Sequence, residues 1–405
     1  MADRHHGPGM AAARRCAIGA FGPLPEAPPL GVYVHLPWCV RKCPYCDFNS
    51  HELRGTAPFA AYIDALLEDL EQELPLLGGR EVATVFFGGG TPSLCPPPLI
   101  GRFLEGLAAR LSVAPDAEIT LEANPGTIER GRFSELAGAG INRVSLGVQS
   151  FQPRLLTAIG RIHDEREAYA AIDELVQSGI PSYNLDLMFG LPGQTVAESA
   201  ADVAAAIAVR PPHLSFYQLT LEPGTPFHRR PPRLPNDEDC WVMEVAATER
   251  LEAAGYRRYE VSAWARPGQE CRHNLNYWSF GDYLGLGAGA HGKLSLDDGR
   301  IVRRWRRRRP LGWLEGPRLE GEQALDAAAR LFEFMLNALR LSDGFTLESF
   351  EARTGLAAGA ALPGLRRGRQ LGLLETSLDS RWRATAFGRR FLNDAQGLFL
   401  PASPG

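Results

Sequence analysis

The spacing of apolar residues in the first part of the chain predicts strands and helices in alternation. Residues 83–87 are apolar except for Thr84 and are followed by glycines, which is typical of a buried strand. Residues 58–74, just before it, carry apolar side chains three and four positions apart, as on one face of a helix. These helix positions are Phe59, Ile63, Leu66, Leu67 and Leu70.

The same alternation continues as far as about residue 255. Further apolar runs begin near residues 32, 118, 143, 183 and 213, and helical, often alanine-rich segments such as 195–209 separate them. Six strand–helix units of this kind predict an α/β fold with a parallel sheet and helices outside it. Closure into a barrel would bring the carboxyl ends of all strands to one rim, where barrel folds carry their active sites.

Two segments of different character follow. Residues 256–300 are aromatic, rich in glycine and broken by turns, which predicts short strands that extend or cover the barrel mouth. Residues 303–309 are all arginine except Trp305. A solvated basic loop is the favoured interpretation, because charge runs usually face water. A surface for an acidic partner or a membrane is the alternative.

The last segment predicts helices and a hairpin. Helical patterns run to a stop at Gly344 and again over FTLESFEARTG, and a hairpin followed by a helix is expected within 374–395. That order is typical of a small winged-helix module, favoured here as a structural or partner-docking lid over a DNA-binding unit. We therefore divide the chain into a disordered leader (1–29), a partial barrel (30–255), a barrel-mouth extension (256–310) and a C-terminal helical module (311–405).

Composition narrows the class of protein. The 405 residues are 45% hydrophobic and 22% charged, as in an ordinary globular protein that resides in the cytoplasm. A formal net charge of -4 argues against a protein that coats nucleic acid. No apolar run approaches the roughly 18 residues that span a bilayer. The leader has no apolar core of a signal peptide, and Met10 within it is an alternative start.

Three cysteines on one short loop carry the chemistry. The first strand ends at Pro37, and Cys39, Cys43 and Cys46 follow in the spacing Cys-x-x-x-Cys-x-x-Cys. Thiolates suit the irons of a 4Fe-4S cluster, and three of them leave one iron corner open. That corner can hold the amine and carboxylate of S-adenosylmethionine, whose sulfonium the cluster would then reduce.

Zinc and disulfides are the competing interpretations. Structural zinc takes four ligands, usually in two close pairs, whereas the other four of the seven cysteines are scattered singly. A disulfide framework is disfavoured in a chain with few cysteines and no secretory signal.

The cysteine spacing, with Tyr45 before the third cysteine, resembles the radical S-adenosylmethionine superfamily. The surrounding PWCVRKCPYCDFNSH is similar to its oxygen-independent coproporphyrinogen III oxidase-like branch. Dehydrogenases of that branch carry a further cysteine two residues after the third, where this chain has Phe48. This departure favours the HemW type, the heme chaperones of the branch. The resemblance implies an incomplete (β/α)6 barrel.

The resemblance also implies a binding site for S-adenosylmethionine. Glycines after a strand let backbone amides approach a ligand, and a buried acid needs a partner such as an amine or sulfonium. Without the cysteine loop, the polar residues that match the family would be interpreted as making ordinary hydrogen bonds at the barrel rim. The positions that match the family are Tyr33, Gly89, Gly90, Thr91, Glu122, Gln149, Arg161 and Asp186.

A second motif, His273-Asn274-Leu275-Asn276-Tyr277-Trp278, is similar to the segment linked with heme handling in the chaperone branch. Imidazole is a ready iron ligand, and Tyr277 and Trp278 can stack on a flat macrocycle. On chemistry alone, a lone histidine is more often structural. His291, and His35 and His51 beside the cysteine loop, are less specific.

Two functions follow as hypotheses. The first is a heme chaperone that carries the cluster and S-adenosylmethionine and passes heme to an acceptor protein. For this chaperone we expect a peripheral membrane contact and a homodimer, and no binding of nucleic acid. The second is a coproporphyrinogen III dehydrogenase that decarboxylates propionate side chains. A radical methylase is a third, weaker interpretation, and the resemblance leaves catalytic activity open.

Overall fold

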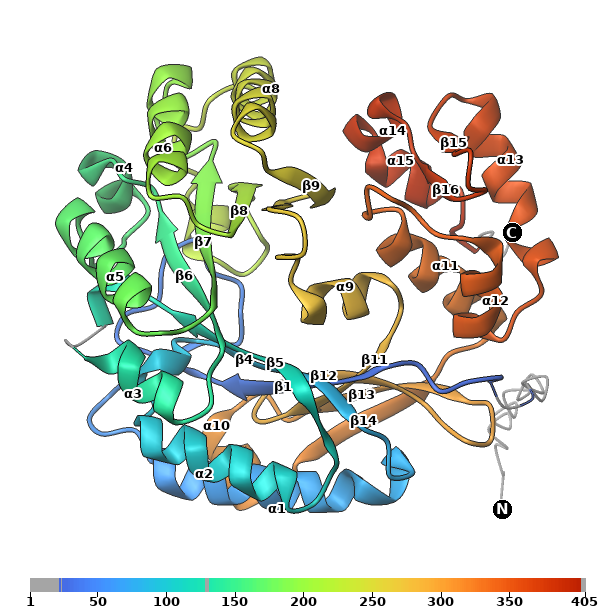
Figure 1. Ribbon diagram of the computed structural model, residues 1–405, viewed down its shortest axis with the longest axis horizontal. Coiled ribbons are helices and arrows are strands. Elements are labelled where there is room, and N and C mark those ends of the chain that lie inside the picture. The colour runs from blue at the N-terminus through green and yellow to red at the C-terminus, as the bar shows by residue number, and fades with distance from the viewer. Residues whose placement is uncertain (1–21, 23, 128–130, 402–405) are drawn as a thin grey trace, which may run out of the picture.

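The structure is a computed structural model that describes residues 22, 24–127 and 131–401. Nearly all of the expected leader lies outside these residues. Within them, a curved twelve-stranded sheet has the order β14-β13-β12-β11-β1-β4-β5-β6-β7-β8-β10-β9. Strands β14 and β9 are its two edges, so the described sheet is open, which confirms the expected incomplete barrel (Figure 1).

Neighbouring parallel strands form the centre of the sheet, as the apolar runs predicted. They are β1 (Leu30–Leu36), β4 (Val82–Gly89), β5 (Val113–Ala123), β6 (Arg143–Gln149), β7 (Ser182–Phe189) and β8 (His213–Gln218). A short parallel pair, β2 (Trp38–Cys39) and β3 (His51–Glu52), brackets the cysteine loop.

The connecting helices cover the convex side of the sheet, where Figure 1 shows them outside the arc of strands. Thr195 caps α6 with its hydroxyl, and apolar faces of these helices bury against Val85, Leu121, Val144 and Leu185 of the strands. The helices are α1 (Phe59–Leu77), α2 (Pro97–Ala108), α3 (Arg132–Gly138), α4 (Pro153–Ala158), α5 (Glu165–Gln177), α6 (Val196–Ala208) and α8 (Asp237–Ala253). The short α7 (Pro226–Arg229) lies instead beside the cysteine loop, where the N–H of Phe227 donates to Pro44 O at 3.0 Å.

Alternate residues of the same strands face the concave side and are largely polar. Side chains of a strand point to opposite faces in turn, so the apolar residues above leave their neighbours to line the barrel interior. The cavities described below are lined by such neighbours: Phe86, Glu122, Arg143, Ser145, Asn184, Asp186, His213 and Ser215.

The segment after the barrel extends both edges of the sheet, as expected from its turns. Within residues 256–300 it contributes β9 (Arg257–Glu260), β10 (Ala263–Ala265), β11 (Asp282–Leu286) and β12 (His291–Ser295). The sheet continues beyond that segment in β13 (Ile301–Arg306) and, after α10 (Pro310–Glu315), in β14 (Leu319–Ala324), where a basic loop and a helical module were expected. The prediction of strands alone was incomplete. Helix α9 (Arg272–Trp278) lies on the concave side of the sheet (Figure 1).

The prediction of a solvated loop over residues 303–309 was wrong for its first half. Arg306 belongs to β13 and is only 1% exposed, because Nε lies 2.9 Å from Asp69 Oδ2 and Nη2 lies 3.0 Å from Glu73 Oε1 on α1. Arg303 and Arg304 also pair with acids. Ion pairs with acids on other elements hold these three arginines in β13. The three arginines that follow are exposed.

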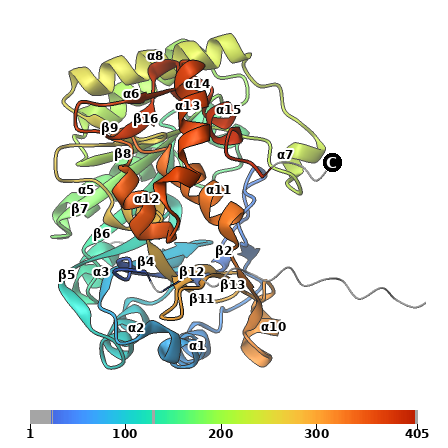
Figure 2. The ribbon, with the colours of Figure 1, turned by 90° about the vertical axis from the view of Figure 1, so that its right-hand side faces the viewer.

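The C-terminal module has its own apolar core around Phe334, Phe345 and Phe350. It lies across the open side of the sheet, in red in Figure 2. Its first helix ends at Ala338, before the expected stop at Gly344, and the expected hairpin is present. The elements are α11 (Ala327–Ala338), α12 (Leu347–Thr354), α13 (Leu362–Gln370), β15 (Leu374–Thr376), β16 (Trp382–Ala384), α14 (Ala386–Arg390) and α15 (Leu392–Gly397).

No helix among the described residues is long and apolar enough to cross a membrane.

Candidate functional site

The cysteine loop is fixed to the turn that follows β4. The N–H of Gly90 donates to Leu36 O at 2.8 Å, and the N–H of Thr91 donates to Trp38 O at 2.7 Å. A Cβ on Gly90 would lie 2.5 Å from that Trp38 oxygen, so only glycine allows this approach. Gly89 has a φ of +121°, which also favours glycine. The glycines are therefore needed first to seat the cysteine loop.

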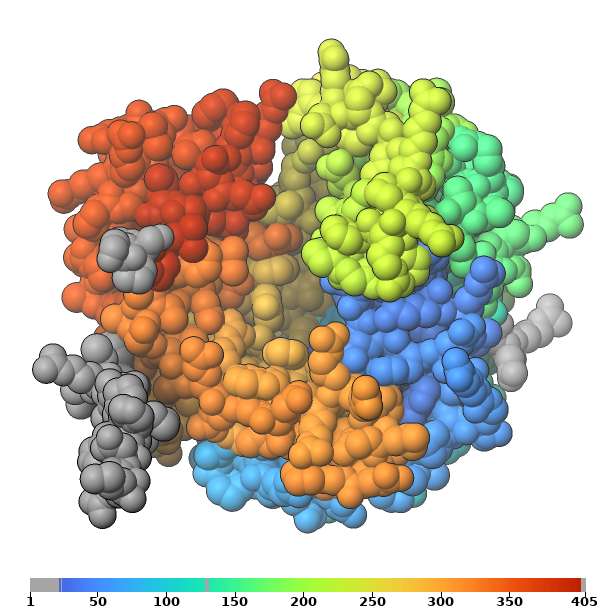
Figure 3. All heavy atoms as spheres, turned by 180° about the vertical axis from the view of Figure 1, so that it is seen from behind, coloured from blue at the N-terminus to red at the C-terminus, as the bar shows by residue number. Residues whose placement is uncertain are grey.

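The three cysteines of the loop open into one cavity with most of the residues expected to bind S-adenosylmethionine. The cavity measures about 410 Å³, and the molecule is hollowed on the face seen in Figure 3 where the blue, orange and yellow-green segments meet. The expected residues that line it are Cys39, Cys43, Cys46, Gly89, Gly90, Thr91, Glu122, Gln149, Arg161 and Asp186. Tyr33 lies elsewhere, as described below.

Arg161 joins the cysteine loop to two strand ends. Its Nη1 lies 3.8 Å from Cys43 Sγ, and its Nη2 donates to Asn124 Oδ1 at 2.5 Å and to Gly147 O. A guanidinium in this position lowers the free-energy cost of a negatively charged thiolate on the cysteine loop. Burial raises the pKa of the Cys39 and Cys46 thiols, and hydrogen bonds from Thr91 to Cys39 and from Ser50 to Cys46 act in the opposite direction.

Two acids form the floor of the cavity. Glu122 Oε2 accepts from Gly89 N–H at 3.1 Å, and Asp186 accepts from Ser145 and Asn184 at 3.0 and 2.7 Å. Burial raises the pKa of both carboxyls, and the nearby Asp186 adds to the effect on Glu122, whose pKa reaches about 7. Such a floor favours a cationic or hydroxyl-bearing ligand, since either relieves the cost of burial.

Gln149 has a strained backbone, with a φ of 68° at the end of β6. Its Oε1 accepts from the hydroxyl of Tyr217 at 2.7 Å, and both side chains line the cavity. Backbone strain in a residue other than glycine is often retained at functional sites. Sequence reasoning missed Tyr217, although its place on an alternate, inward-facing position of β8 was a usable signal.

The donor set of the loop fits a 4Fe-4S cluster. No group of three His, Cys, Asp or Glu side chains in the described chain is arranged to hold a single metal ion. In a cluster each thiolate binds a separate iron, so the sulfurs need not converge on one point. Three thiols on one loop beside a cavity thus match a cluster with one open iron corner.

A second cavity of about 560 Å³ adjoins the first and shares Phe48, Gly89 and Glu122 with it. Tyr33 lies here, on the side of Glu122 away from the cysteines, with its hydroxyl 2.9 Å from His35 Nδ1. The lining is aromatic and holds several imidazoles. It includes Tyr33, His35, Phe48, Asn49, Phe86, His273, Asn274, Tyr277, Tyr283 and His291.

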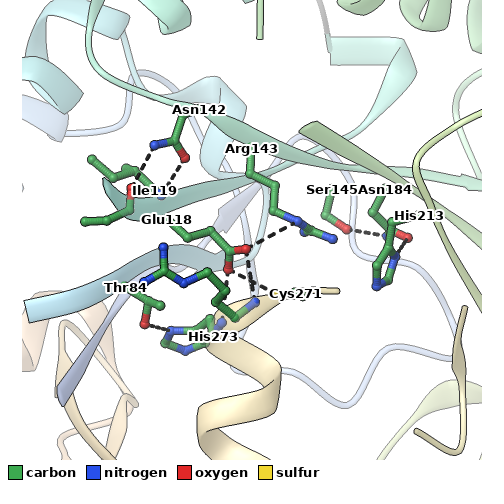
Figure 4. Close-up of polar contacts among 12 residues, drawn as sticks. Thr84, Glu118, Ile119, Asn142, Arg143, Ser145, Asn184, His213, Cys271 and His273 are labelled. Carbon is green, nitrogen blue, oxygen red and sulfur yellow. Dashed lines mark hydrogen bonds and ion pairs between the residues drawn. The ribbon is translucent and has the colours of Figure 1, made fainter. Parts of the chain in front are cut away.

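His273 lies in the first turn of α9 and is held in place through Glu118. Glu118 Oε1 accepts from His273 N–H and Glu118 Oε2 from Arg272 N–H, both at 3.0 Å (Figure 4). Nδ1 of His273 lies 2.9 Å from Thr84 Oγ1, and no described residue hydrogen-bonds to Nε2. Burial lowers the pKa of His273 to about 4, so the imidazole is neutral at physiological pH, as metal ligation requires.

The three residues expected to handle heme do not all face one cavity. Tyr277, one helical turn after His273, lines the second cavity and packs on Tyr283 at a ring distance of 5.0 Å. Trp278 is instead covered by the guanidinium of Arg340 at 4.2 Å. The spacing of four residues places His273 and Tyr277 on one face of α9, whereas Trp278 falls on another.

Comparison with known proteins places this arrangement in a family. Residues 33–204 match the radical SAM superfamily, and residues 325–391 match the HemN C-terminal domain. Heme chaperone HemW of Escherichia coli is 48% identical over 375 residues, which cover 93% of this chain and 99% of that protein. The chain belongs to the HemW family of radical SAM proteins.

Other HemW relatives extend the match. HemW of Haemophilus influenzae is 44% identical over 93% of this chain and 99% of its own, and HemW of Mycobacterium tuberculosis is 38% identical over 84% and 87%. Coproporphyrinogen III oxidase (HemN) from Escherichia coli shares the fold, with a TM-score of 0.77 at 24% identity over 92% of this chain and 90% of that one. Radical SAM membership implies a 4Fe-4S cluster and S-adenosylmethionine for this HemW-family chain.

Proposed function

We propose that the protein is a heme chaperone that holds heme in the second cavity and passes it to an acceptor protein. The neutral, oriented imidazole of His273 in an aromatic cavity is the observation that carries the proposal. It is supported by the names of the HemW relatives, which describe heme chaperones.

The cofactor side of the proposal assigns roles to the first cavity. Cys39, Cys43 and Cys46 would hold a 4Fe-4S cluster, which supplies an electron to the sulfonium of S-adenosylmethionine when both are bound. Arg161 positions the cysteine loop, and Glu122 and Asp186 offer oxygens to the cationic and hydroxyl groups of that ligand. The remaining expected ligand contacts fall to Gly89, Gly90, Thr91 and Gln149.

The heme side uses His273 and Tyr277. Nδ1 faces Thr84, so Nε2 would be the atom that binds iron, while Tyr277 and Phe86 present rings to the macrocycle. We assign Trp278 a supporting role through its contact with Arg340 rather than direct contact with heme.

The delivery step needs a surface. We propose that heme leaves through the second cavity toward a cytoplasmic acceptor, and that the exposed arginines at 307–309 face that acceptor or an anionic membrane surface. Asn49, which lines the cavity, donates to the carbonyl oxygen of Arg308 at 2.8 Å, so the basic segment adjoins the cavity mouth. We also propose domain boundaries near residues 30 and 256, and we place the third between β14 and α11 rather than at 311, because β14 pairs with β13 in the main sheet.

A second candidate is a coproporphyrinogen III dehydrogenase, favoured by the shared fold with HemN. Against it stands Phe48, which is 60% exposed and lines both cavities at the position where dehydrogenases of the branch carry a cysteine.

Anaerobic titration of the reconstituted protein with heme, followed at the Soret band with and without S-adenosylmethionine, tests the proposal. We expect saturable binding at one heme per chain and weaker binding in His273→Ala. The matched control is His228→Ala, an imidazole outside both cavities. Absence of saturable binding would overturn the chaperone function, and turnover of coproporphyrinogen III would then favour the second candidate.

A further inference from the structure

The guanidinium of Arg143 is buried without a hydrogen bond to any described residue. The side chain is 3% exposed, and its Nε and Nη2 are buried atoms without hydrogen-bond partners. Its one ion pair joins Nε to Glu118 Oε2 at 3.8 Å, beyond hydrogen-bond distance (Figure 4). Buried charged groups are normally both paired and hydrogen-bonded, because desolvation is costly. Nε and Nη2 are covered by protein atoms, so the spare donor capacity of Arg143 lies at Nη1.

Glu118 does not hydrogen-bond to Arg143, because other donors already occupy both of its carboxylate oxygens. Its two oxygens accept from the backbone N–H groups of Arg272 and His273, and the Cys271 thiol lies 3.4 Å from Oε1. The carboxylate is thus directed at the start of α9, and Arg143 faces it only from the side.

Arg143 points into a polar chamber of about 190 Å³ inside the barrel. The other polar walls satisfy one another. Asn184 donates to Ser145 at 2.7 Å and accepts from Ser215 at 3.1 Å, and His213 lies between Asn184 and Tyr259 at 2.6 and 2.8 Å. Among the described residues that line the chamber, Arg143 is the one with buried side-chain nitrogens that lack a hydrogen-bond partner.

The chamber adjoins both larger cavities. It shares Phe86, Glu122 and Asn274 with the aromatic cavity, and Glu122, Ser145 and Asp186 with the cysteine cavity. Since a water molecule occupies about 30 Å³ of liquid, the chamber holds a short side arm of a ligand but no macrocycle. A ligand whose body lies in the aromatic cavity could therefore extend one polar arm to Arg143.

We propose that Arg143 binds one propionate carboxylate of heme in this chamber, an inference that rests on the proposed function. A guanidinium N–H, here that of Nη1, and a carboxylate form a charge-assisted hydrogen bond, and heme carries propionates at its edge. Asp186 and Glu122 would face the incoming carboxylate. Asp186 is already engaged by Ser145 and Asn184, and Glu122 by the N–H of Gly89.

The test compares heme with its dimethyl ester, which has the same ring and iron but no free carboxylates. Both are titrated into the reconstituted protein in the same detergent and followed at the Soret band. We expect the wild-type protein to bind heme roughly tenfold to a hundredfold more tightly than the ester, as hydrogen bonds to charged groups are worth that much. Arg143→Met should remove this preference and leave ester binding nearly unchanged.

Two further variants guard the interpretation. Arg143→Lys keeps the charge and should retain part of the preference, and Arg166→Met, on the exposed face of α5 and outside all three cavities, is the matched arginine control, expected to behave as wild type. Cluster absorption reports that each variant is folded. Equal weakening of heme and ester in Arg143→Met would overturn the inference, because Arg143 would then act only by supporting Glu118 and α9. No heme binding in the wild-type protein would overturn the proposed function itself.

Discussion

Thr84 Oγ1 and His273 Nδ1 lie 2.9 Å apart and join β4 to α9 across the barrel interior. The contact fixes the imidazole plane and leaves Nε2 without a hydrogen bond to any described residue. Outer-shell partners of this kind orient a metal-binding imidazole and set which nitrogen carries the proton. The relationship makes Thr84 part of the proposed heme site although it does not line the second cavity.

Thr84→Val should weaken heme binding about tenfold, since the isosteric methyl group cannot hold Nδ1. The Soret titration measures the affinity, and Thr84→Ser, which keeps the hydroxyl, should bind heme as the wild type does. Equal affinity in the Val and Ser variants would show that the contact does not orient a ligand.

Cys39→Ala should abolish cluster assembly, because a cluster with only two protein thiolates on this loop is poorly held. Iron content and visible absorption after anaerobic reconstitution measure the loss. Cys240→Ala, which removes a buried thiol outside both cavities, is the control and should keep its iron. A brown Cys39→Ala protein with full iron content would refute the cluster assignment.

Loss of the proton from Glu122 should lower the free energy of unfolding as the pH rises. Its pKa is raised from 4.5 to about 7 in the folded state, mainly by burial and then by Asp186. The folded state therefore holds the proton of Glu122 more tightly than the unfolded state does. The stabilisation that this gives to the folded state is complete below pH 4.5 and is lost as the pH rises through about 7.

Glu122→Gln should accordingly flatten that decline and gain roughly 1–2 kcal/mol at the alkaline end, measured without S-adenosylmethionine as melting temperature against pH. Glu105→Gln, an exposed acid on α2, should reproduce the wild-type profile. If Glu122→Gln follows the wild-type profile as well, Glu122 is not the group that titrates.

Arg306→Met should lower the free energy of unfolding by about 3–5 kcal/mol, because it strands the buried carboxylates of Asp69 and Glu73. Denaturant unfolding gives the value. Arg307→Met, one position later and exposed, should change it by less than about 0.5 kcal/mol. Similar losses in both variants would mean that the ion pairs to α1 contribute little.

The sequence alone identified features that depend on local spacing. Short apolar runs located the parallel strands, and apolar residues spaced three and four positions apart located their helices, because each element buries its apolar side chains whatever its neighbours are. The spacing of Cys39, Cys43 and Cys46 likewise predicted the cluster loop, since three thiolates on one loop have few other uses. The position of Phe48 favoured the HemW type within the branch.

Tertiary structure decided what distant residues do together. Glu118 and Cys271 are 153 positions apart, yet their contact sets where α9 and His273 lie. Arg306 appears in a run of arginines that predicted a solvated loop, and only the acids of α1 bury it. Neither pairing has a local pattern, because electrostatic and hydrogen-bond partners are chosen by proximity in the fold. The polar chamber around Arg143 exists for the same reason.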